Sequence, residues 1–159
     1  MDQPVDKFTI QPLGTLTIVV GLPGSGKSTY IHSLTESNSN LSVYDDYQGE
    51  SYEKSDDPRL SKHFKPLTQD LMQAKRVIVS DIRYCIPREL NAFLAAVLNV
   101  APNVQIEFTF FENNPEACRR NIIARNRPDR VEKELELLKK LSAGYSVPAI
   151  EGLKVYDSE

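Results

Sequence analysis

The sequence predicts an α/β fold in which a mostly parallel sheet of about five strands is covered by helices on both faces. Two observations predict this fold. Short, continuous apolar segments alternate with longer segments of helical periodicity, and strands buried on both faces of a parallel sheet have this continuous apolar character. A glycine-rich segment also follows directly after the first apolar segment. Because 159 residues are enough for one core, we expect residues 1–159 to form a single domain.

The expected strands are short and apolar. The first covers residues 16–20, a β-branched segment between Gly14 and Gly21 that is too short for a helix. Similar segments predict further strands at residues 41–44, 77–79, 104–111 and 153–155. Residues 1–12 precede this pattern, and we expect an extra edge strand or a loose arm there.

Helical periodicity predicts helices at residues 27–37, 60–71, 87–100, 115–126 and 129–145. Pro66 predicts a kink or a late start in the second helix, because proline disrupts a helix interior. Asp129, followed three residues later by Glu132, predicts a capping box at the start of the last helix. The buried stripe of that helix is expected at Val131, Leu135, Leu138, Leu141 and Tyr145. Residues 48–59 are polar and acidic without periodicity, which predicts a loop or an irregular lid.

Composition and charge limit the class of protein. The net charge of −3 and the pI of about 5.5 argue against broad, non-specific binding of nucleic acid. Charges are nevertheless clustered: residues 45–57 contain six acids and one lysine, whereas residues 119–130 contain five arginines and one aspartate. No apolar segment approaches the ~20 residues of a membrane span, and Cys85 and Cys118 have no metal-binding spacing. We therefore expect a cytoplasmic protein with no membrane association, and nothing in the sequence indicates a stable protein partner.

The segment GLPGSGKST fits the phosphate-binding loop signature, with Gly21, four residues, and then Gly26-Lys27-Ser28. Its glycines let backbone N–H groups converge on an anion at a helix N-terminus, where the helix dipole also favours negative charge. Lys27 is expected to reach the β- and γ-phosphates of ATP, and the Ser28 hydroxyl to ligate Mg²⁺. This loop predicts a P-loop NTPase three-layer sandwich. The residues expected to bind the nucleotide here are Gly21, Pro23, Gly24, Ser25, Gly26, Lys27, Ser28 and Thr29.

Other residues favour a kinase among the P-loop classes. The chain contains no Asn-Lys-x-Asp motif for reading guanine, and it is short for a ring-forming motor. Asp81 ends the third predicted strand, where it is a candidate to hold Mg²⁺ or to orient an arginine. Asp45 and Asp46 follow the second strand, and either is a candidate to accept the proton of an acceptor hydroxyl. Within an arginine-rich lid at about residues 119–133, Arg120, Arg125 and Arg127 are candidates to cover the transferred phosphoryl group.

The order GLPGSGKST, YDDYQ, VIVSDIR and CRRNIIAR resembles the kinase domain of phage-type polynucleotide 5′-hydroxyl kinase and its small P-loop relatives. Those relatives include small phage kinases that phosphorylate hydroxymethylated pyrimidines such as 5-hydroxymethyluracil in DNA. The resemblance covers residues 17–145. It implies transfer of the γ-phosphate of ATP to a hydroxyl, with Asp45 as the general base, Asp81 as the aspartate after the third strand and Arg125 as the lid arginine.

One departure from that family concerns the acceptor. The family usually follows Asp-Asp-Tyr with an arginine that grips the phosphate next to the acceptor hydroxyl, whereas this chain has Gln48. Arg83, two residues after Asp81, is a candidate to compensate, so the expected acceptor-side residues are Asp46, Gln48, Asp81 and Arg83. The acceptor stays open between a 5′-hydroxyl end and a modified base. A flipped base would need an aromatic platform, for which the candidates are Tyr47, Tyr52 and Tyr84.

Two alternatives to a nucleic-acid kinase remain at this point. One is a kinase of a small metabolite or nucleoside, although the adenylate-kinase acceptor motif Asp-Gly-Phe-Pro-Arg is absent. The other is a non-catalytic nucleotide-binding switch or adaptor. Asp45 argues against the switch, since a pure binder needs no proton acceptor there.

Overall fold

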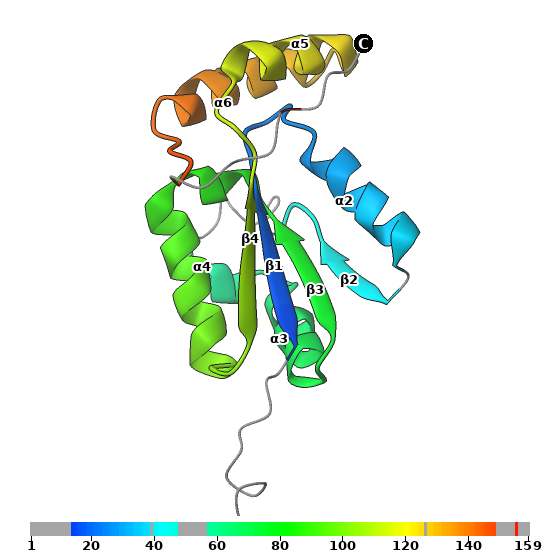
Figure 1. Cartoon of the computed structure of the whole chain (residues 1–159). Coiled ribbons are helices and arrows are strands. Elements are labelled where there is room, and N and C mark those ends of the chain that lie inside the picture. The colour runs from blue at the N-terminus through cyan, green and yellow to red at the C-terminus, as the bar shows by residue number, and fades with distance from the viewer. Residues whose placement is uncertain (1–13, 39, 48–56, 126, 149–154, 156–159) are drawn as a thin grey trace, which may run out of the picture.

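The computed structural model describes residues 14–38, 40–47, 57–125, 127–148 and 155. Four parallel strands form its sheet in the order β2-β3-β1-β4, so that the first strand lies inside the sheet (Figure 1). The strands are β1 (Thr15–Val20), β2 (Leu41–Tyr44), β3 (Arg76–Ser80) and β4 (Gln105–Phe110). Because all four strands run in the same direction, their carboxyl ends meet at one edge of the sheet.

Helices cover both faces of this sheet, as expected. The α-helices are α2 (Lys27–Ser37), α3 (Phe64–Met72), α4 (Pro87–Val100), α5 (Pro115–Arg125) and α6 (Val131–Ser142), and two 3₁₀ helices are η2 (Pro58–Leu60) and η3 (Ile82–Cys85). Successive strand residues point to opposite faces. Val19 therefore packs with Ile31 of α2, while Ile18 belongs to the larger core that includes Leu67 of α3 and Phe93 of α4. In Figure 1, α5 and α6 lie across the carboxyl ends of the strands.

Most of the predicted elements agree with the structure. Helices α2 and α4 and strand β2 have the predicted bounds. Helix α3 begins late, at Phe64, which places Pro66 in its first turn, where a missing N–H has no partner to lose. Of the predicted fifth strand at 153–155, only residue 155 is described, and it lies in no strand. The predictions for residues 1–12 and 48–56 fall outside the described residues.

Two local predictions were wrong. Residues 58–60 form a 3₁₀ helix, where the sequence predicted the end of a loop and, at residue 60, the start of the second helix. Asp57 caps this 3₁₀ helix by accepting a hydrogen bond from the Arg59 N–H. The capping box at Asp129 does not form, since α6 has Arg130 at its N-cap without a side-chain hydrogen bond. A backbone turn replaces the capping box: the N–H groups of Arg130 and Val131 both donate to the carbonyl of Arg127, at 2.8 and 2.9 Å. Tyr145 of the predicted stripe is buried, but it lies beyond the end of α6.

None of the helices in the described part of the chain has the length and hydrophobicity that a membrane span requires.

Gly14 gives a test of how tightly the amino end of the sheet is packed. Its N–H donates to Leu71 O at 2.7 Å, and a Cβ at this position would collide with the Lys75 carbonyl. Gly14→Ala should therefore lower the free energy of unfolding by about 2 kcal/mol or more, measured by urea denaturation. Gly144→Ala is the matched control, because a Cβ there meets no atom within 4 Å, and its effect should stay within about 0.5 kcal/mol. Equal stabilities for the two variants would contradict this packing.

Candidate active site

The glycine loop connects β1 to α2 and adopts the conformation that its sequence predicts. Gly24 and Gly26 have φ angles of 82° and 96°, in the left-handed region that glycine tolerates best. Gly26 is also the N-cap residue of α2, and no side chain caps this end of the helix. The backbone N–H groups of the first turn are therefore left to bind an anion, with the favourable end of the helix dipole beside them.

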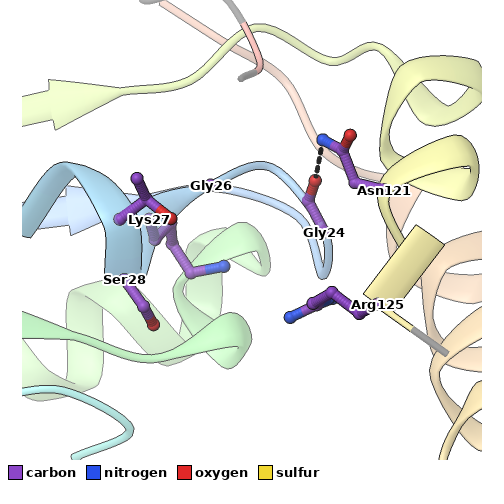
Figure 2. Close-up of a pocket in the computed structure, with 7 residues that line it drawn as sticks. Gly24, Gly26, Lys27, Ser28, Asn121 and Arg125 are labelled. Carbon is purple, nitrogen blue, oxygen red and sulfur yellow. Dashed lines mark hydrogen bonds between the residues drawn. The ribbon is translucent and has the colours of Figure 1, made fainter. Parts of the chain in front are cut away.

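A cavity of about 110 Å³ lies over this loop, and two distant segments line it (Figure 2). The loop and the start of α2 contribute one side, and α5 contributes the other. The lining residues are Gly24, Gly26, Lys27, Ser28, Thr29, Asn121 and Arg125. Figure 2 shows the Lys27 amine and the Arg125 guanidinium pointing toward one another across this space. Two cationic groups and a helix N-terminus make the cavity suited to polyphosphate, so the residues present fit an ATP phosphate chain.

Lys27 is buried in the floor of the cavity. Its Nζ donates a hydrogen bond to Leu22 O at 3.0 Å. Burial lowers the pKa of Lys27, and the nearby acidic groups of Cys85, Asp45, Cys118 and Asp81 oppose this effect. A bound polyphosphate would supply the negative charge that a buried ammonium lacks.

Ser28 and Asp45 are brought together from α2 and from the end of β2. The Ser28 hydroxyl donates to Asp45 Oδ2 at 2.7 Å, and both side chains are exposed. Hydroxyl and carboxylate oxygens are ligands that Mg²⁺ accepts, and Mg²⁺ is usually held by one or two such groups together with substrate phosphates. Within the described residues no group of three or more His, Cys, Asp or Glu side chains could hold a metal ion. Ser28 would hold Mg²⁺ together with the phosphates of a bound nucleotide.

The backbone after Asp45 places the neighbouring side chains. Asp46 has a φ of 57°, a left-handed conformation that is uncommon outside glycine but is tolerated by aspartate. The next residue, Tyr47, donates its N–H to Ser80 O at the end of β3, at 2.9 Å. The two aspartates thus lie at the carboxyl edge of the sheet, as the sequence predicted.

Asp81 and Arg83 are both buried, directly after the end of β3. Asp81 is 4% exposed, and its Oδ1 accepts the Arg83 N–H at 2.9 Å, which caps η3. The structure places Asp45 against Ser28, and Asp81 close enough to Lys27 to oppose the lowering of its pKa. The Arg83 side chain is 1% exposed and lies beside the buried Glu89, with Nη1 3.7 Å from Oε1. Arg83 is not among the residues that line the cavity.

Only one of the three predicted lid arginines lines the cavity. Arg125 lies at the end of α5, and its Nη2 is 3.7 Å from Glu134 Oε1 of α6. Arg120 is exposed and 3.9 Å from Glu116 on its own helix, and Arg127 is exposed beyond the end of α5. Helix α5 and the first turn of α6 belong to the arginine-rich segment for which the sequence predicted a lid, and we refer to these two helical segments as the lid.

Of the three tyrosines predicted as candidate platforms for a flipped base, the two that the structure describes are core residues. Tyr47 and Tyr84 are 1% and 2% exposed, and each packs against Phe93 with ring centroids 5.0 Å apart. A base could not stack on either ring without rearrangement of the core. Gln48 and Tyr52 lie outside the described residues.

Asn121 is the residue of this site that sequence reasoning missed. Its Nδ2 donates to Gly24 O at 2.8 Å, and the side chain is almost fully buried. The sequence did offer one indication that Asn121 belongs to the site. It lies one helical turn before Arg125, so the two side chains share a face of the predicted helix. A polar residue in the middle of a predicted helix does not by itself indicate which backbone group it contacts.

A parallel sheet, a glycine loop that opens α2, and a lid arginine beside that loop define a kinase-like P-loop domain. Residues 16–148 match the family model described as AAA domain, and the chain belongs to this family.

One relative and several solved structures are similar to this chain. Protein R277 of Acanthamoeba polyphaga mimivirus is 28% identical over 133 residues, which cover 83% of this chain and 86% of that protein. A fungal RNA kinase has a TM-score of 0.60 at 14% identity, covering 86% of this chain and 68% of the other. A gluconokinase from Sinorhizobium meliloti 1021 has a TM-score of 0.55 at 18% identity, covering 92% and 82%.

A chain of the Pnkp1/Rnl/Hen1 RNA repair complex is also similar, with a TM-score of 0.57 at 18% identity. The match covers 88% of the present chain but only 49% of that chain, so the present chain spans about half of its length. Because the sequence identities to these solved structures are only 14–18%, the structural similarity shows the fold alone.

The two cysteines beside Lys27 provide a test of the cavity floor. Burial raises the pKa of Cys85 to about 12 and that of Cys118 to about 11. Since the thiolate is the reactive form, both thiols should resist iodoacetamide at pH 7.5 in the native protein, and both should react in 8 M urea. Intact-mass spectrometry measures the number of adducts. Alkylation of native Cys85 at the rate seen in urea would contradict this buried environment.

Proposed function

We propose that this protein is an ATP-dependent phosphotransferase that moves the γ-phosphate of ATP to a hydroxyl group on nucleic acid. The observation that carries the proposal is the single site in which Lys27, Arg125 and the Ser28–Asp45 pair meet above a glycine loop. A protein that only binds nucleotide needs the loop and the lysine. It has no need for a proton acceptor, such as the exposed carboxylate of Asp45 at the edge of this site.

Each residue has a distinct role in the proposed reaction. The loop N–H groups, Lys27 and Arg125 would hold the phosphate chain and balance the charge of the transferred group. The acceptor hydroxyl oxygen would form a bond to the γ-phosphorus while the bond between the γ-phosphorus and the ADP oxygen breaks. Asp45 would accept the proton that the hydroxyl loses in this step. Mg²⁺ at Ser28 would supply further neutralisation of phosphate charge.

Two observations support nucleic acid as the acceptor. Two of the similar solved structures are a fungal RNA kinase and a chain of an RNA repair complex. The arginine-rich segment at 119–130 gives this acidic chain a local positive surface beside the site. The acceptor hydroxyl would be either a polynucleotide 5′-end or the hydroxymethyl group of a modified pyrimidine in DNA. Gln48 and the burial of Arg83 beside Glu89 favour a hydroxyl without a neighbouring phosphate.

A kinase of a small metabolite is the second candidate. The specific observation in its favour is the gluconokinase, which matches 92% of the chain with a TM-score similar to those of the RNA-repair proteins.

The decisive experiment is a transfer assay with γ-labelled ATP and Mg²⁺ against a panel of acceptors. The panel contains 5′-hydroxyl DNA, 5′-hydroxyl RNA, DNA with 5-hydroxymethyluracil, nucleosides, and small sugars including gluconate. Label on a polynucleotide supports the proposal, and the labelled member identifies the acceptor. Label on gluconate or a nucleoside alone favours the second candidate. Hydrolysis of ATP without any labelled acceptor would instead indicate a nucleotide-binding switch.

Asp45→Asn tests the proton acceptor. The amide keeps the size of the side chain but cannot take a proton, so transfer should fall by about 10²- to 10⁴-fold. Binding of ATP, measured without Mg²⁺ by equilibrium dialysis, should change little. Asp57→Asn is the matched control, since Asp57 pairs with Arg59 away from the cavity, and its transfer rate should equal that of the wild type. Normal transfer by Asp45→Asn would remove Asp45 from the mechanism.

A further inference from the structure

Helix α5 contacts the phosphate loop at Gly24. The Gly24 carbonyl accepts the hydrogen bond from Asn121 Nδ2 at 2.8 Å, and Figure 2 shows this bond crossing from the helix to the loop. The two residues are 97 positions apart in the sequence. The bond therefore joins the lid to the phosphate loop at the side of the cavity, which both residues line.

The contact is also tight. A Cβ on Gly24 would lie 2.5 Å from Cys118 O and 2.9 Å from Ile122 Cγ1, so no side chain fits between loop and helix. Cys118 and Ile122 are both fully buried. Because three residues of one helical turn press on Gly24, the position of α5 along its own axis is fixed relative to the loop.

Arg125 lies one turn further along the same face of α5. Residues four apart are neighbours on a helix surface, and both Asn121 and Arg125 line the cavity. On its other side, the Arg125 guanidinium lies 3.7 Å from Glu134. The distance between Arg125 and Lys27 is therefore determined by the contact that Asn121 makes one turn earlier.

We propose that Asn121 is a positioning residue, which ties α5 to the phosphate loop and thereby holds Arg125 at the phosphate-binding cavity. The proposal rests on the nucleotide-binding part of the proposed function and does not depend on the acceptor. Asn121 would act through Arg125 rather than by touching the reacting atoms.

A double-mutant cycle tests this coupling. The variants are Asn121→Ala, Arg125→Ala and the double variant, and the readout is the ratio of ATP to ADP affinity, measured by equilibrium dialysis. Arg125→Ala should reduce the preference for ATP about tenfold, because a third phosphate adds charge for the guanidinium to bind. Asn121→Ala should cause a similar loss, and the double variant should lose no more than Arg125→Ala alone.

Ile123→Ala is the control on the same helix, because Ile123 is exposed on the face away from the loop. It should leave the ratio unchanged. Losses that multiply in the double variant, an unchanged ratio in Asn121→Ala, or a wild type without preference for ATP would each overturn the role of Asn121. Since no acceptor is needed, a negative transfer assay would remove the proposed kinase function without affecting this result.

Hydrogen–deuterium exchange of the nucleotide-free protein gives a second readout, with Asn121→Ser as a milder variant. Loss of the bond to Gly24 should speed exchange about tenfold or more in peptides that cover residues 21–28 and in those that cover 115–125. Ile123→Ala should change neither region. Faster exchange in α5 alone, or in neither region, would show that Asn121 does not join the lid to the loop.

Discussion

The close approach of α5 to Gly24 is the constraint on which the candidate site depends. Lys27 and Ser28 come from the first crossover of the sheet, whereas Arg125 comes from the helix that follows β4. Gly24 is the point where these segments meet, and its lack of a side chain serves the packing of α5 as much as the binding of phosphate. A buried hydrogen bond contributes only about 1 kcal/mol, but a buried amide left without its partner costs about 1 to 3 kcal/mol. The bond from Asn121 is therefore important for specifying where the helix lies.

The opposite side of the site is fixed by the core. Asp45 and Asp46 follow β2, an edge strand in the described sheet, and the chain is then held by Tyr47. The Tyr47 ring packs against Phe93, its N–H donates to Ser80 O, and its hydroxyl donates to Pro58 O at 3.0 Å. A buried aromatic residue directly after the two aspartates limits how far they can move from Ser28. The sheet edge and the aromatic core together place the proposed proton acceptor.

The sequence allowed good prediction wherever the signal was local. Glycine spacing, apolar segments and proline at helix starts predicted the loop, the strands and the bounds of α2 and α4. Failures arose where distant groups decide the outcome. The carbonyl of Arg127 replaces Asp129 as the partner of the first N–H groups of α6. Ser28 donates to Asp45, a bond between two segments 17 residues apart that the sequence did not predict. The contact of Asn121 could not be predicted, since its partner is a backbone carbonyl 97 residues away.

The free energies of their ion pairs distinguish the two arginines as ligands for a phosphate. Arg83 and Glu89 are both buried, and breaking such a pair leaves an uncompensated charge at a cost of about 3 to 5 kcal/mol. Arg125 is about one-third exposed, and its 3.7 Å pair with Glu134 belongs to a class worth under about 1 kcal/mol. A charge-assisted hydrogen bond to an anion is worth about 1.5 to 3 kcal/mol. The proposed binding of phosphate would therefore engage Arg125 at a lower cost than Arg83, which would have to leave Glu89 in a buried environment. The weak pair with Glu134 leaves the Arg125 guanidinium available to a bound nucleotide, as the proposed function requires.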